Sequence, residues 1–499
     1  MKKHWLYPVF ALVLIVAGCK KDLKVIPIVD NGGVPVTSLS VSSLFQNNMV
    51  IQRDKPVTIW GHAPAKKQVT VNVSWNSNPM VTTADASGNW KISVPAATVN
   101  ASPQTITVTS PGYTTITASN VLIGDVWVCS GQSNMVMPMD TMAPFDGVLN
   151  YVAEIAAANY PMIRMLTVQE DLEPGPLTYL KRPVSWDVCS PATVRTTSAV
   201  AYYFARKLNT TLNVPIGIII SAVNGSYCQD WANVEAMETD PALPNNYLAG
   251  SSGLYNGMIN PLINLSIKGF AWYQGENNEH DSPVSAYTRL NADLVNGWRT
   301  KFNQPELPFY YVQIAPFADD YNSTNPPGGN PVSDYLAYFR ETQANIRPLL
   351  TNIGMVVTMD VGDPANHHPP DKEPIGERLG LLALNYTYGQ NVQCTGPQFA
   401  SYTVSQNTAT INFEPGTANG LTTSNNAALK QYFYVAGTDQ VFRRGQAVIS
   451  GTSIVVTAPQ GTPLPIKAIR YAFTDAAVTN LQNAEGLPAE PFRTDNWNN

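Results

Sequence analysis

The chain has 499 residues, which corresponds to about three domains of ordinary size. Apolar residues make up 44% and exclude a globally disordered chain, whereas charged residues make up only 13%, so the polar surface must rely on uncharged side chains. With 30 Lys and Arg against 36 Asp and Glu the net charge is -6, and the absence of a basic excess disfavours general nucleic-acid binding.

The first 19 residues are predicted to form an export signal. Lys2 and Lys3 precede an apolar run that is short for a membrane-spanning helix, and the run ends in small residues directly before Cys19. This ending resembles a bacterial lipoprotein signal, in which Cys19 would become lipidated and anchor the chain to a membrane. Residues 20–37 then read as a tether. We therefore expect an extracytoplasmic protein, either periplasmic or exposed at the cell surface.

Residues 38–120 are expected to form an N-terminal β domain. Val69, Val71 and Val73 alternate with polar residues, and the turn at 87–89 precedes a second alternating run from Trp90. Short alternating strands separated by frequent turns are typical of a β-sandwich.

Residues 121–396 are expected to form an α/β domain. Five apolar, strand-like runs alternate with amphipathic stretches, and strands that are apolar throughout indicate a parallel sheet covered on both faces by helices. The runs are 121–129, 216–221, 270–273, 309–315 and 355–360. The helical stretches are 199–208, 287–298, 335–346 and 375–384. From residue 397 to 499 the β pattern returns, which predicts a second β-sandwich-like domain.

Polar and titratable residues follow four of the apolar runs. In open α/β sheets, ligands bind at these carboxyl ends of the strands. These segments are Ser130–Met135, Ala222–Ser226, Gln274–Asn278 and Val361–His368. A nucleophilic serine needs a base, most often histidine, and within the α/β unit the candidates are His280, His367 and His368. Histidine pairs in loops are more often solvated than catalytic, so position alone does not choose among them.

Taken together, these segments resemble the sialate O-acetylesterase family of carbohydrate esterases, which has an SGNH-hydrolase fold. The resemblance covers nearly everything after the tether. It is carried by Leu44–Trp60, Gly124–Met135, Leu254–Ile259, Trp272–Asn278, His368–Leu379 and Glu485–Asp495.

The resemblance implies a sheet of the SGNH type and a serine esterase that uses no cofactor. Ser133 of the Gly-Gln-Ser-Asn motif would be the nucleophile and His368 the base, and the substrate would be an acetyl ester of a carbohydrate, first of all a sialic acid. The oxyanion would be stabilised by the backbone N–H groups of Ser133 and Gly225 and by a side-chain amide. We favour Gln274 for that amide, with Asn278 as the alternative.

Several of these residues have a second interpretation. Gln274 and Glu276 could instead form a network that holds the Ser133 loop. Trp231 could line the pocket or could simply be buried. Up to two disulfides are possible among Cys129, Cys189, Cys228 and Cys394, and their spacing does not decide the pairing.

The sequence departs from the family pattern at two places. Asn224 precedes Gly225 where the family usually has glycine, so it would crowd the site or add a donor. Asn366 occupies a position before His368 where SGNH enzymes often carry aspartate. We therefore expect Asp363, Asp360 or the neutral Asn366 to orient His368, or else a Ser–His dyad.

Three alternatives to sialate esterase activity follow from the sequence. Acetylated xylan is the close alternative within the same chemistry. A catalytically weak carbohydrate-binding lipoprotein is a reading from another class, motivated by the missing aspartate. A metal cluster of Asp363, His367, His368 and Asp371 is the third, but its spacing matches no ligand motif. No phosphate-binding or dinucleotide-binding fingerprint is present.

Overall fold

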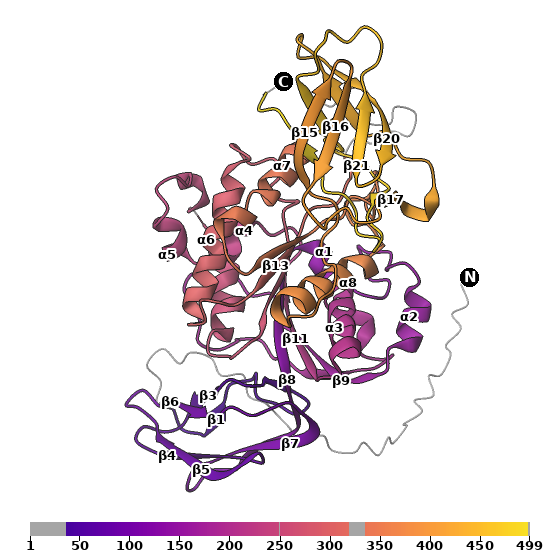
Figure 1. The fold of residues 1–499 in the computed structure, drawn as a ribbon. Helices are drawn as coiled ribbons and strands as arrows, with labels where there is room; N and C mark the ends of the chain where they lie inside the picture. The colour runs from indigo at the N-terminus through magenta and orange to yellow at the C-terminus, as the bar shows by residue number, and fades with distance from the viewer. Residues whose placement is uncertain (1–35, 249, 319–334, 498–499) are drawn as a thin grey trace, which may run out of the picture.

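The computed structural model describes residues 36–248, 250–318 and 335–497, so the signal, Cys19 and nearly all of the tether lie outside the described residues. Seven strands of an 11-strand sheet cross the middle of the molecule (Figure 1) in the order β10-β9-β11-β8-β12-β13-β14. The seven strands are β8 (Ile116–Gly131), β9 (Tyr160–Thr167), β10 (Trp186–Cys189), β11 (Ile216–Ala222), β12 (Gly269–Tyr273), β13 (Phe309–Val312) and β14 (Ile353–Val356). All neighbours pair in parallel except β10, which pairs antiparallel with β9 at the edge.

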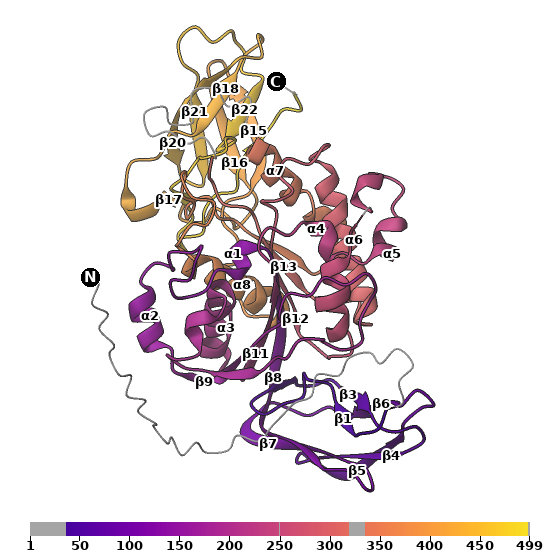
Figure 2. The ribbon, with the colours of Figure 1, turned by 180° about the vertical axis from the view of Figure 1, so that it is seen from behind.

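Helices cover both faces of this sheet, as expected for an α/β domain. Successive side chains of β8 alternate between the faces: Trp127 packs in the core beneath α3 and α8, whereas Val126 and Val128 pack in the core beneath α6. Figures 1 and 2 show α3 and α8 together on one side of the sheet and α4, α5 and α6 on the other. The helices are α1 (Ser133–Val136), α2 (Tyr151–Ala157), α3 (Ala199–Leu212), α4 (Cys228–Trp231), α5 (Val234–Glu238), α6 (Ala286–Lys301), α7 (Tyr335–Ala344) and α8 (Glu373–Leu382).

The predicted strands and helices of this domain are confirmed, but β9 and β10 are not anticipated. Pro161 and Arg164 interrupt the apolar pattern of β9. Arg164 is nonetheless buried, because its guanidinium donates to the backbone carbonyls of Pro161, Asn48 and Asn120. These distant partners offset the cost of burying the charge, and a local hydrophobicity pattern does not contain them.

The strand order places the end of β8 at a topological switch point. β8 comes first along the chain and lies inside the sheet, and the chain then builds β9 and β11 on one side of it before crossing to β12, β13 and β14 on the other. Loops leaving neighbouring strands on the two sides of a switch point diverge and open a crevice at their carboxyl ends. Ser133 follows β8 at this crevice.

Two β-rich regions flank the α/β body, so the predicted fold class is confirmed. The N-terminal region contains β1 (Ser40–Val41), β2 (Val50–Gln52), β3 (Val57–His62), β4 (Gln68–Val73), β5 (Asn76–Thr83), β6 (Asn89–Val94) and β7 (Asn100–Thr109). The C-terminal region contains β15 (Phe399–Ser405), β16 (Thr408–Phe413), β17 (Thr422–Thr423), β18 (Phe433–Ala436), β19 (Phe442–Arg444), β20 (Gln446–Ser450), β21 (Ser453–Thr457), β22 (Ala468–Tyr471), β23 (Leu481–Gln482) and β24 (Phe492–Arg493). Its two four-strand sheets are β15-β16-β21-β20 and β19-β18-β22-β24.

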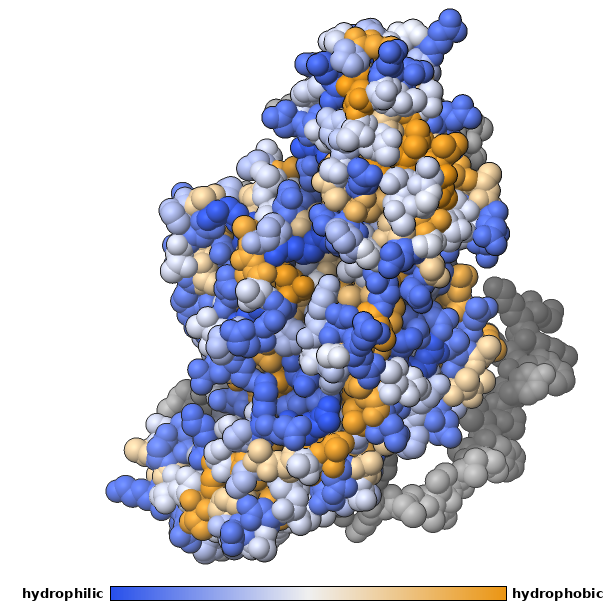
Figure 3. Space-filling model, in the orientation of Figure 1, coloured by the Kyte–Doolittle hydropathy of each residue, from blue (hydrophilic) through white to orange (hydrophobic). Residues whose placement is uncertain are grey.

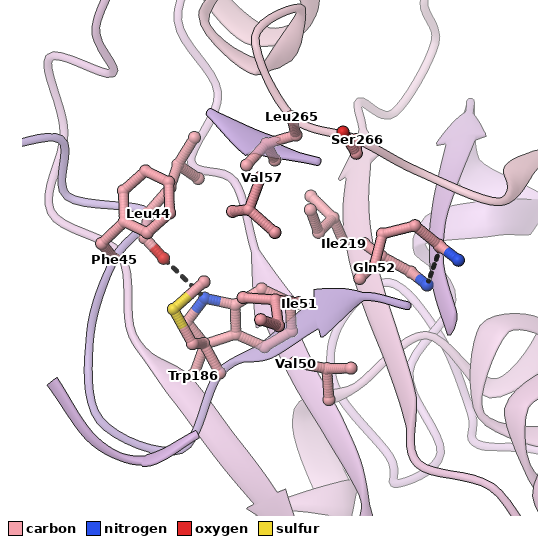
Figure 4. Close-up of a pocket in the computed structure, with 12 residues that line it drawn as sticks. Leu44, Phe45, Val50, Ile51, Gln52, Val57, Trp186, Ile219, Leu265 and Ser266 are labelled. Carbon is pink, nitrogen blue, oxygen red and sulfur yellow. Dashed lines mark hydrogen bonds between the residues drawn. The ribbon is translucent and has the colours of Figure 1, made fainter. Parts of the chain in front are cut away.

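The N-terminal region is joined to the body by continuous packing. β7 pairs with the first half of β8, and the second half of β8 pairs with β11 and β12. At the junction Trp186 Nε1 donates to the Leu44 carbonyl at 3.0 Å (Figure 4). The apolar cavity there leaves only about 10 Å³ free, roughly the space of one water molecule. This feature is therefore an interior packing defect rather than a binding site.

Polar residues dominate much of the face of the α/β body shown in Figure 3. No helix in the described ranges combines the length and apolar character needed to span a bilayer. Cys129, Cys189, Cys228 and Cys394 are all free thiols, so neither of the two possible disulfides forms.

Candidate active site

Ser133 lies where β8 ends and α1 begins. The turn requires Gly131, because its φ is +139° and a methyl group there would lie 2.0 Å from the Tyr273 carbonyl oxygen. The next residue, Gln132, donates its backbone N–H to that carbonyl at 3.0 Å, which ties the turn to β12. Ser133 is 7% exposed and lines an open hollow of about 300 Å³.

The hollow collects residues from all four predicted segments. Its polar lining comes from the ends of β8, β11 and β12, its imidazoles come from the loop after β14, and three apolar side chains complete the walls. The polar lining is Gln132, Ser133, Asn224, Gly225, Glu276, Asn277 and Glu279, the imidazoles are His367 and His368, and the apolar walls are Pro144, Phe145 and Phe317.

Two backbone N–H groups at this hollow are available to a ligand. The hydrogen bonds that start α1 are donated by Met135 and Val136 to the Gln132 carbonyl, so the Ser133 N–H is not used by the helix. Gly225 has φ +66°, and its carbonyl accepts from Asn277 Nδ2 at 2.6 Å while its N–H has no acceptor among the described residues. The Ser133 and Gly225 N–H groups are the ones predicted to stabilise an oxyanion.

Gln274 and Asn278 do not supply the predicted oxyanion amide. Both are fully buried beneath the hollow, and the Gln274 amide donates to Asn278 Oδ1 at 2.7 Å and to Gln132 Oε1 at 3.1 Å. Asn278 Nδ2 donates in turn to Gln229 and Asp281. With their donors occupied, these amides fit the alternative interpretation, a network that supports the Ser133 loop.

Trp231 is also buried rather than exposed in the pocket. Its Nε1 donates to Ser226 Oγ at 2.9 Å, and its ring packs edge-on against Trp272 with centroids 6.2 Å apart. It therefore stiffens the loop that carries Asn224 and Gly225. Asn224 is exposed and does line the hollow.

A buried cluster lies directly behind Ser133. Asn134 donates Nδ2 to Glu276 Oε1 and to the His367 carbonyl, and its Oδ1 accepts from Lys372 Nζ at 2.6 Å. Burial lowers the pKa of Lys372 to about 7, against the opposing effect of Glu276, and burial raises the pKa of Glu276. Asn134 thereby connects the nucleophile turn to the segments that follow β12 and β14.

His368 is half-buried between the rings of Phe145 and His367, at centroid distances of 5.0 and 4.0 Å. Burial lowers its pKa to about 4, and the neighbouring His367 and Lys372 add to this shift. The imidazole is therefore neutral at neutral pH and able to accept a proton. Its Nε2 is buried and has no hydrogen-bond partner among the described residues. Ser133 and His368 line the same hollow, but no hydrogen bond joins them in the structure.

Asp363, Asn366 and Asp360 do not make the predicted contact with the imidazole. Asp363 Oδ1 accepts from the Ala365 N–H at 3.0 Å, and Asn366 Oδ1 accepts from the backbone N–H of His368 at 2.8 Å. Asp360 forms a two-point ion pair with Arg378. The three side chains shape the loop that presents His368 and leave its ring to other partners.

The metal cluster considered as an alternative does not assemble either. In the three described ranges, no group of three or more His, Cys, Asp or Glu side chains could hold a metal ion. Sequence analysis also did not single out Asn134, Lys372 and Glu279, which contribute to the site. The first two lie inside the family segments, directly after Ser133 and four residues after His368, so position in those segments is the signal that could have found them.

Comparison with known proteins identifies the family of this chain. Residues 123–375, about half of the chain, match the model of the family described as carbohydrate esterase, sialic acid-specific acetylesterase. The chain belongs to this family. Human sialate O-acetylesterase is 28% identical over 396 residues, covering 71% of this chain and 72% of the human protein. The mouse sialate O-acetylesterase is 26% identical over 424 residues, covering 71% of this chain and 75% of its own length.

A solved structure in this group extends the match beyond the α/β body. The crystal structure of a carbohydrate acetylesterase from Xanthomonas citri is 30% identical and superimposes with a TM-score of 0.82, covering 93% of this chain and 100% of that one. The likeness therefore includes the flanking β-rich regions.

Proposed function

We propose that the chain is a serine esterase that removes acetyl groups from carbohydrates. The observation that carries this proposal is that Ser133, the neutral imidazole of His368 and the two available N–H groups of Ser133 and Gly225 meet in one hollow. A nucleophile, a base and oxyanion donors at one position are the components of acyl transfer.

In the proposed reaction, His368 takes the proton of Ser133 as Oγ attacks the acetyl carbonyl carbon. The oxyanion that forms accepts hydrogen bonds from the N–H groups of Ser133 and Gly225. When the tetrahedral intermediate collapses, the ester C–O bond breaks and the sugar oxygen receives the proton from the imidazolium. Water, deprotonated by His368, then attacks the acetyl-enzyme and releases acetate and Ser133.

We assign the electrostatic stabilisation of the imidazolium to Glu276. This carboxylate lines the same hollow as His368, and its Oε2 has no partner among the described residues. Lys372 and Asn134 favour its ionised form against the effect of burial. Glu276→Gln should therefore lower kcat by about 10- to 100-fold, whereas Asp363→Ala should leave kcat within about twofold. If acetate-release assays showed a larger loss of kcat in Asp363→Ala than in Glu276→Gln, Asp363 would be the carboxylate that stabilises the imidazolium.

The test of the chemistry is release of acetate from 4-nitrophenyl acetate and from an acetylated sugar by the purified chain. Ser133→Ala should lower kcat by at least about 10³-fold, with an unchanged melting temperature. Equal rates for the two proteins would refute the esterase. Binding of an acetylated glycan without any release of acetate would instead favour the carbohydrate-binding lipoprotein.

We also propose that the mature chain is anchored to a bacterial membrane through a lipid on Cys19, in the periplasm or at the cell surface. The support is the sequence of residues 1–19, with its basic start, apolar run and small residues before Cys19. Incorporation of labelled palmitate into the wild-type chain, and its loss in Cys19→Ala, would test this proposal. Equal labelling of the two chains would contradict it.

A further inference from the structure

The side chain of Asn277 joins two of the loops that meet at the catalytic hollow. It belongs to the segment that follows β12, and its Nδ2 donates to the Gly225 carbonyl oxygen at 2.6 Å in the segment that follows β11. Asn277 lines the hollow, whereas the neighbouring amides of Gln274 and Asn278 are buried beneath it. Asn277 is therefore the amide of this segment that can act at the surface of the site.

Few other contacts restrain Gly225. The residue is exposed, and apart from its chain neighbours no atom lies within 4 Å of the position that a side-chain methyl group would take. In the part of the chain that the structure describes, the contact with Asn277 is the one hydrogen bond made by the Gly225 backbone. Its φ of +66° is one of several conformations that glycine adopts readily, so a specific contact is needed to select it.

The residue after Gly225 is firmly held. Ser226 Oγ accepts from Trp231 Nε1 at 2.9 Å, and the Ser226 carbonyl accepts from Gln274 Nε2 at 3.2 Å. Both of these partners are buried. Gly225 thus lies between a fixed residue and an exposed loop, and Asn277 supplies the contact at the glycine itself.

The backbone of Asn277 is tied to the nucleophile turn. Its N–H donates to Gln132 Oε1 at 3.2 Å, and the same oxygen accepts from the Gly275 N–H at 3.2 Å. Gln132 is buried and directly precedes Ser133. Asn277 therefore links the two residues whose N–H groups would bind the oxyanion, since it reaches Ser133 through Gln132 and Gly225 through its carbonyl.

The direction of the Gly225 N–H depends on the position of its carbonyl. Only two rotatable bonds separate the two groups, so a contact that fixes the carbonyl limits the rotations that direct the N–H. Oxyanion donors are most effective when they already point to the place where the charge will develop. A restrained Gly225 avoids the reorganisation that a mobile glycine would need during the reaction.

We propose that Asn277 is a positioning residue for the oxyanion site, which holds Gly225 in the conformation that presents its N–H to the hollow. The proposal rests on the esterase function proposed above. The oxyanion exists in the tetrahedral intermediate and not in the bound substrate. Loss of this contact therefore lowers kcat more than it weakens substrate binding.

The first test compares Asn277→Ala and Asn277→Asp with the wild type on 4-nitrophenyl acetate. Both substitutions remove the donor to the Gly225 carbonyl, and the second keeps nearly the same size. We expect kcat to fall by about 10- to 100-fold in both, with KM within about threefold. A kcat within about twofold of the wild type, or a KM that rises as much as kcat falls, would overturn the proposal.

The matched control is Asn412→Ala in the C-terminal region. Asn412 Nδ2 donates to Ser401 Oγ at 3.4 Å, so this variant also removes an asparagine side-chain donor. It should leave kcat, KM and the melting temperature unchanged. An equal fall of kcat in Asn412→Ala would mean that the loss in Asn277→Ala is not specific to the site, which would also overturn the proposal.

Methylboronic acid provides a readout that a purely structural role would not change. It mimics the tetrahedral intermediate: a bond forms between Ser133 Oγ and boron, the Ser133 proton passes to His368, and the boron becomes a tetrahedral anion with an oxygen at the oxyanion site. Its inhibition constant should rise by about tenfold or more in Asn277→Ala. An unchanged inhibition constant beside a lowered kcat would contradict the proposal.

A double mutant tests whether Asn277 acts through Gly225. Gly225→Ala should itself lower kcat, because a φ of +66° is unfavourable for alanine. With both residues changed, the fall in kcat should be smaller than the product of the two separate falls, since both substitutions disturb the same peptide. A fall equal to that product would show that the two residues act independently and would refute the proposed link.

Failure of this proposal is distinguishable from failure of the esterase assignment. If cleavage of 4-nitrophenyl acetate depends on Ser133 and Asn277→Ala is as fast as the wild type, only the role of Asn277 is wrong. If no cleavage depends on Ser133, the proposed function is wrong and this inference is wrong with it.

Discussion

Burial of His368 determines the pH range in which the proposed base can work. Its pKa is lowered to about 4 because the half-buried ring resists protonation and because His367 and Lys372 lie nearby. The neutral form, which accepts the Ser133 proton, therefore persists well below the ordinary histidine pKa of about 6.5. An acidic environment should leave the site active.

The acid limb of kcat/KM should accordingly have its midpoint near pH 4 to 5 for 4-nitrophenyl acetate, measured from pH 3.5 to 8. His367→Ala should move this midpoint upward, because one of the groups that lower the His368 pKa is removed. A midpoint near 6.5 in the wild type would mean that the ring is better solvated than the structure indicates. The same shift predicts that the folded chain gains stability as pH rises from about 4 to 6.5, because the unfolded state binds more protons there.

Lys372 influences the reaction indirectly, through its contact with Asn134. Lys372→Met should remove the donor to Asn134 Oδ1 and leave Glu276 without its buried counter-charge, so the Ser133 turn and the His367 carbonyl lose a common support. We expect kcat to fall by about 10- to 100-fold, with a loss of about 3 kcal/mol in unfolding free energy.

The matched control for that variant is Lys301→Met, which removes an exposed pair with Glu235. It should cost less than about 1 kcal/mol and leave kcat unchanged. If Lys372→Met lowered stability but left the kcat of the folded fraction and its pH profile intact, the lysine would be structural only.

For individual residues, the position in a family motif predicted which residues lie together at the site, but it did not predict the direction of their side chains. Ser133, Gly225, Glu276 and His368 do line one hollow, whereas Gln274 and Asn278 turn inward toward buried partners. The direction of a side chain after a strand end depends on loop hydrogen bonds between distant segments. Asp363 illustrates this, since its carboxylate is used by the N–H of Ala365.

Among the elements, α8 has a close fit against its neighbour. It packs on α3, and a methyl group at Gly376 would lie 2.5 Å from Tyr203 Cβ and 2.8 Å from the Val200 carbonyl oxygen. The same helix carries Arg378, which holds Asp360 in the loop that leads to His368. Displacement of α8 would therefore move the catalytic loop.

Gly376→Ala should lower the unfolding free energy by about 1–3 kcal/mol, since overpacking outweighs the gain in helix propensity. It should also reduce kcat. Gly175→Ala is the control, because no atom lies within 4 Å of its added methyl group, and its effect should stay within about 0.5 kcal/mol. Urea denaturation of the wild type, Gly376→Ala and Gly175→Ala measures both changes in unfolding free energy. Equal stability of all three proteins would show that α3 and α8 can move apart to accommodate the added methyl group.

Long elements with regular periodicity were predictable, and short irregular ones were not. The apolar periods of α3 and α6 and the continuous apolar run of β8 follow from burial of one helix face or both sheet faces. β9 was missed because its charged Arg164 is satisfied by carbonyls from the N-terminal region.

Across the whole molecule, the C-terminal β-rich region is bound to the α/β body by buried polar contacts. Arg340 of α7 is fully buried and donates to the backbone carbonyls of Thr474 and Asp475. The Thr479 N–H donates to the Met359 carbonyl at 2.8 Å, just before the catalytic loop. The C-terminal region thus supports the loop that presents His368.

Arg340→Met should therefore lower the unfolding free energy by about 2–4 kcal/mol, because two buried carbonyls lose their donors. Arg443→Met, which breaks a surface pair with Asp439, should cost less than about 1 kcal/mol. For Arg340→Met, the temperature at which the fold melts and the temperature at which activity is lost should fall together. A variant that kept full activity after the C-terminal region had melted would show that the two parts are independent.

The order of β, α/β and β regions was readable from hydrophobic periods, but their connection was not. The expected boundary between residues 120 and 121 falls inside β8, which serves both regions as one strand. A change in pattern marks where the neighbours of a strand change, and here the backbone continues through that change without a linker.

Because β8 is shared by both regions, the N-terminal region is a rigid support for the α/β body. Sixteen residues of strand span at most roughly 50 Å, with one end in the N-terminal region and the other end two residues before Ser133. If the chain is tethered at its N-terminus, the catalytic hollow lies at the opposite end of β8 from the N-terminal region, away from the anchoring surface. Such a separation would let the enzyme work on polymers that cannot approach the bilayer closely.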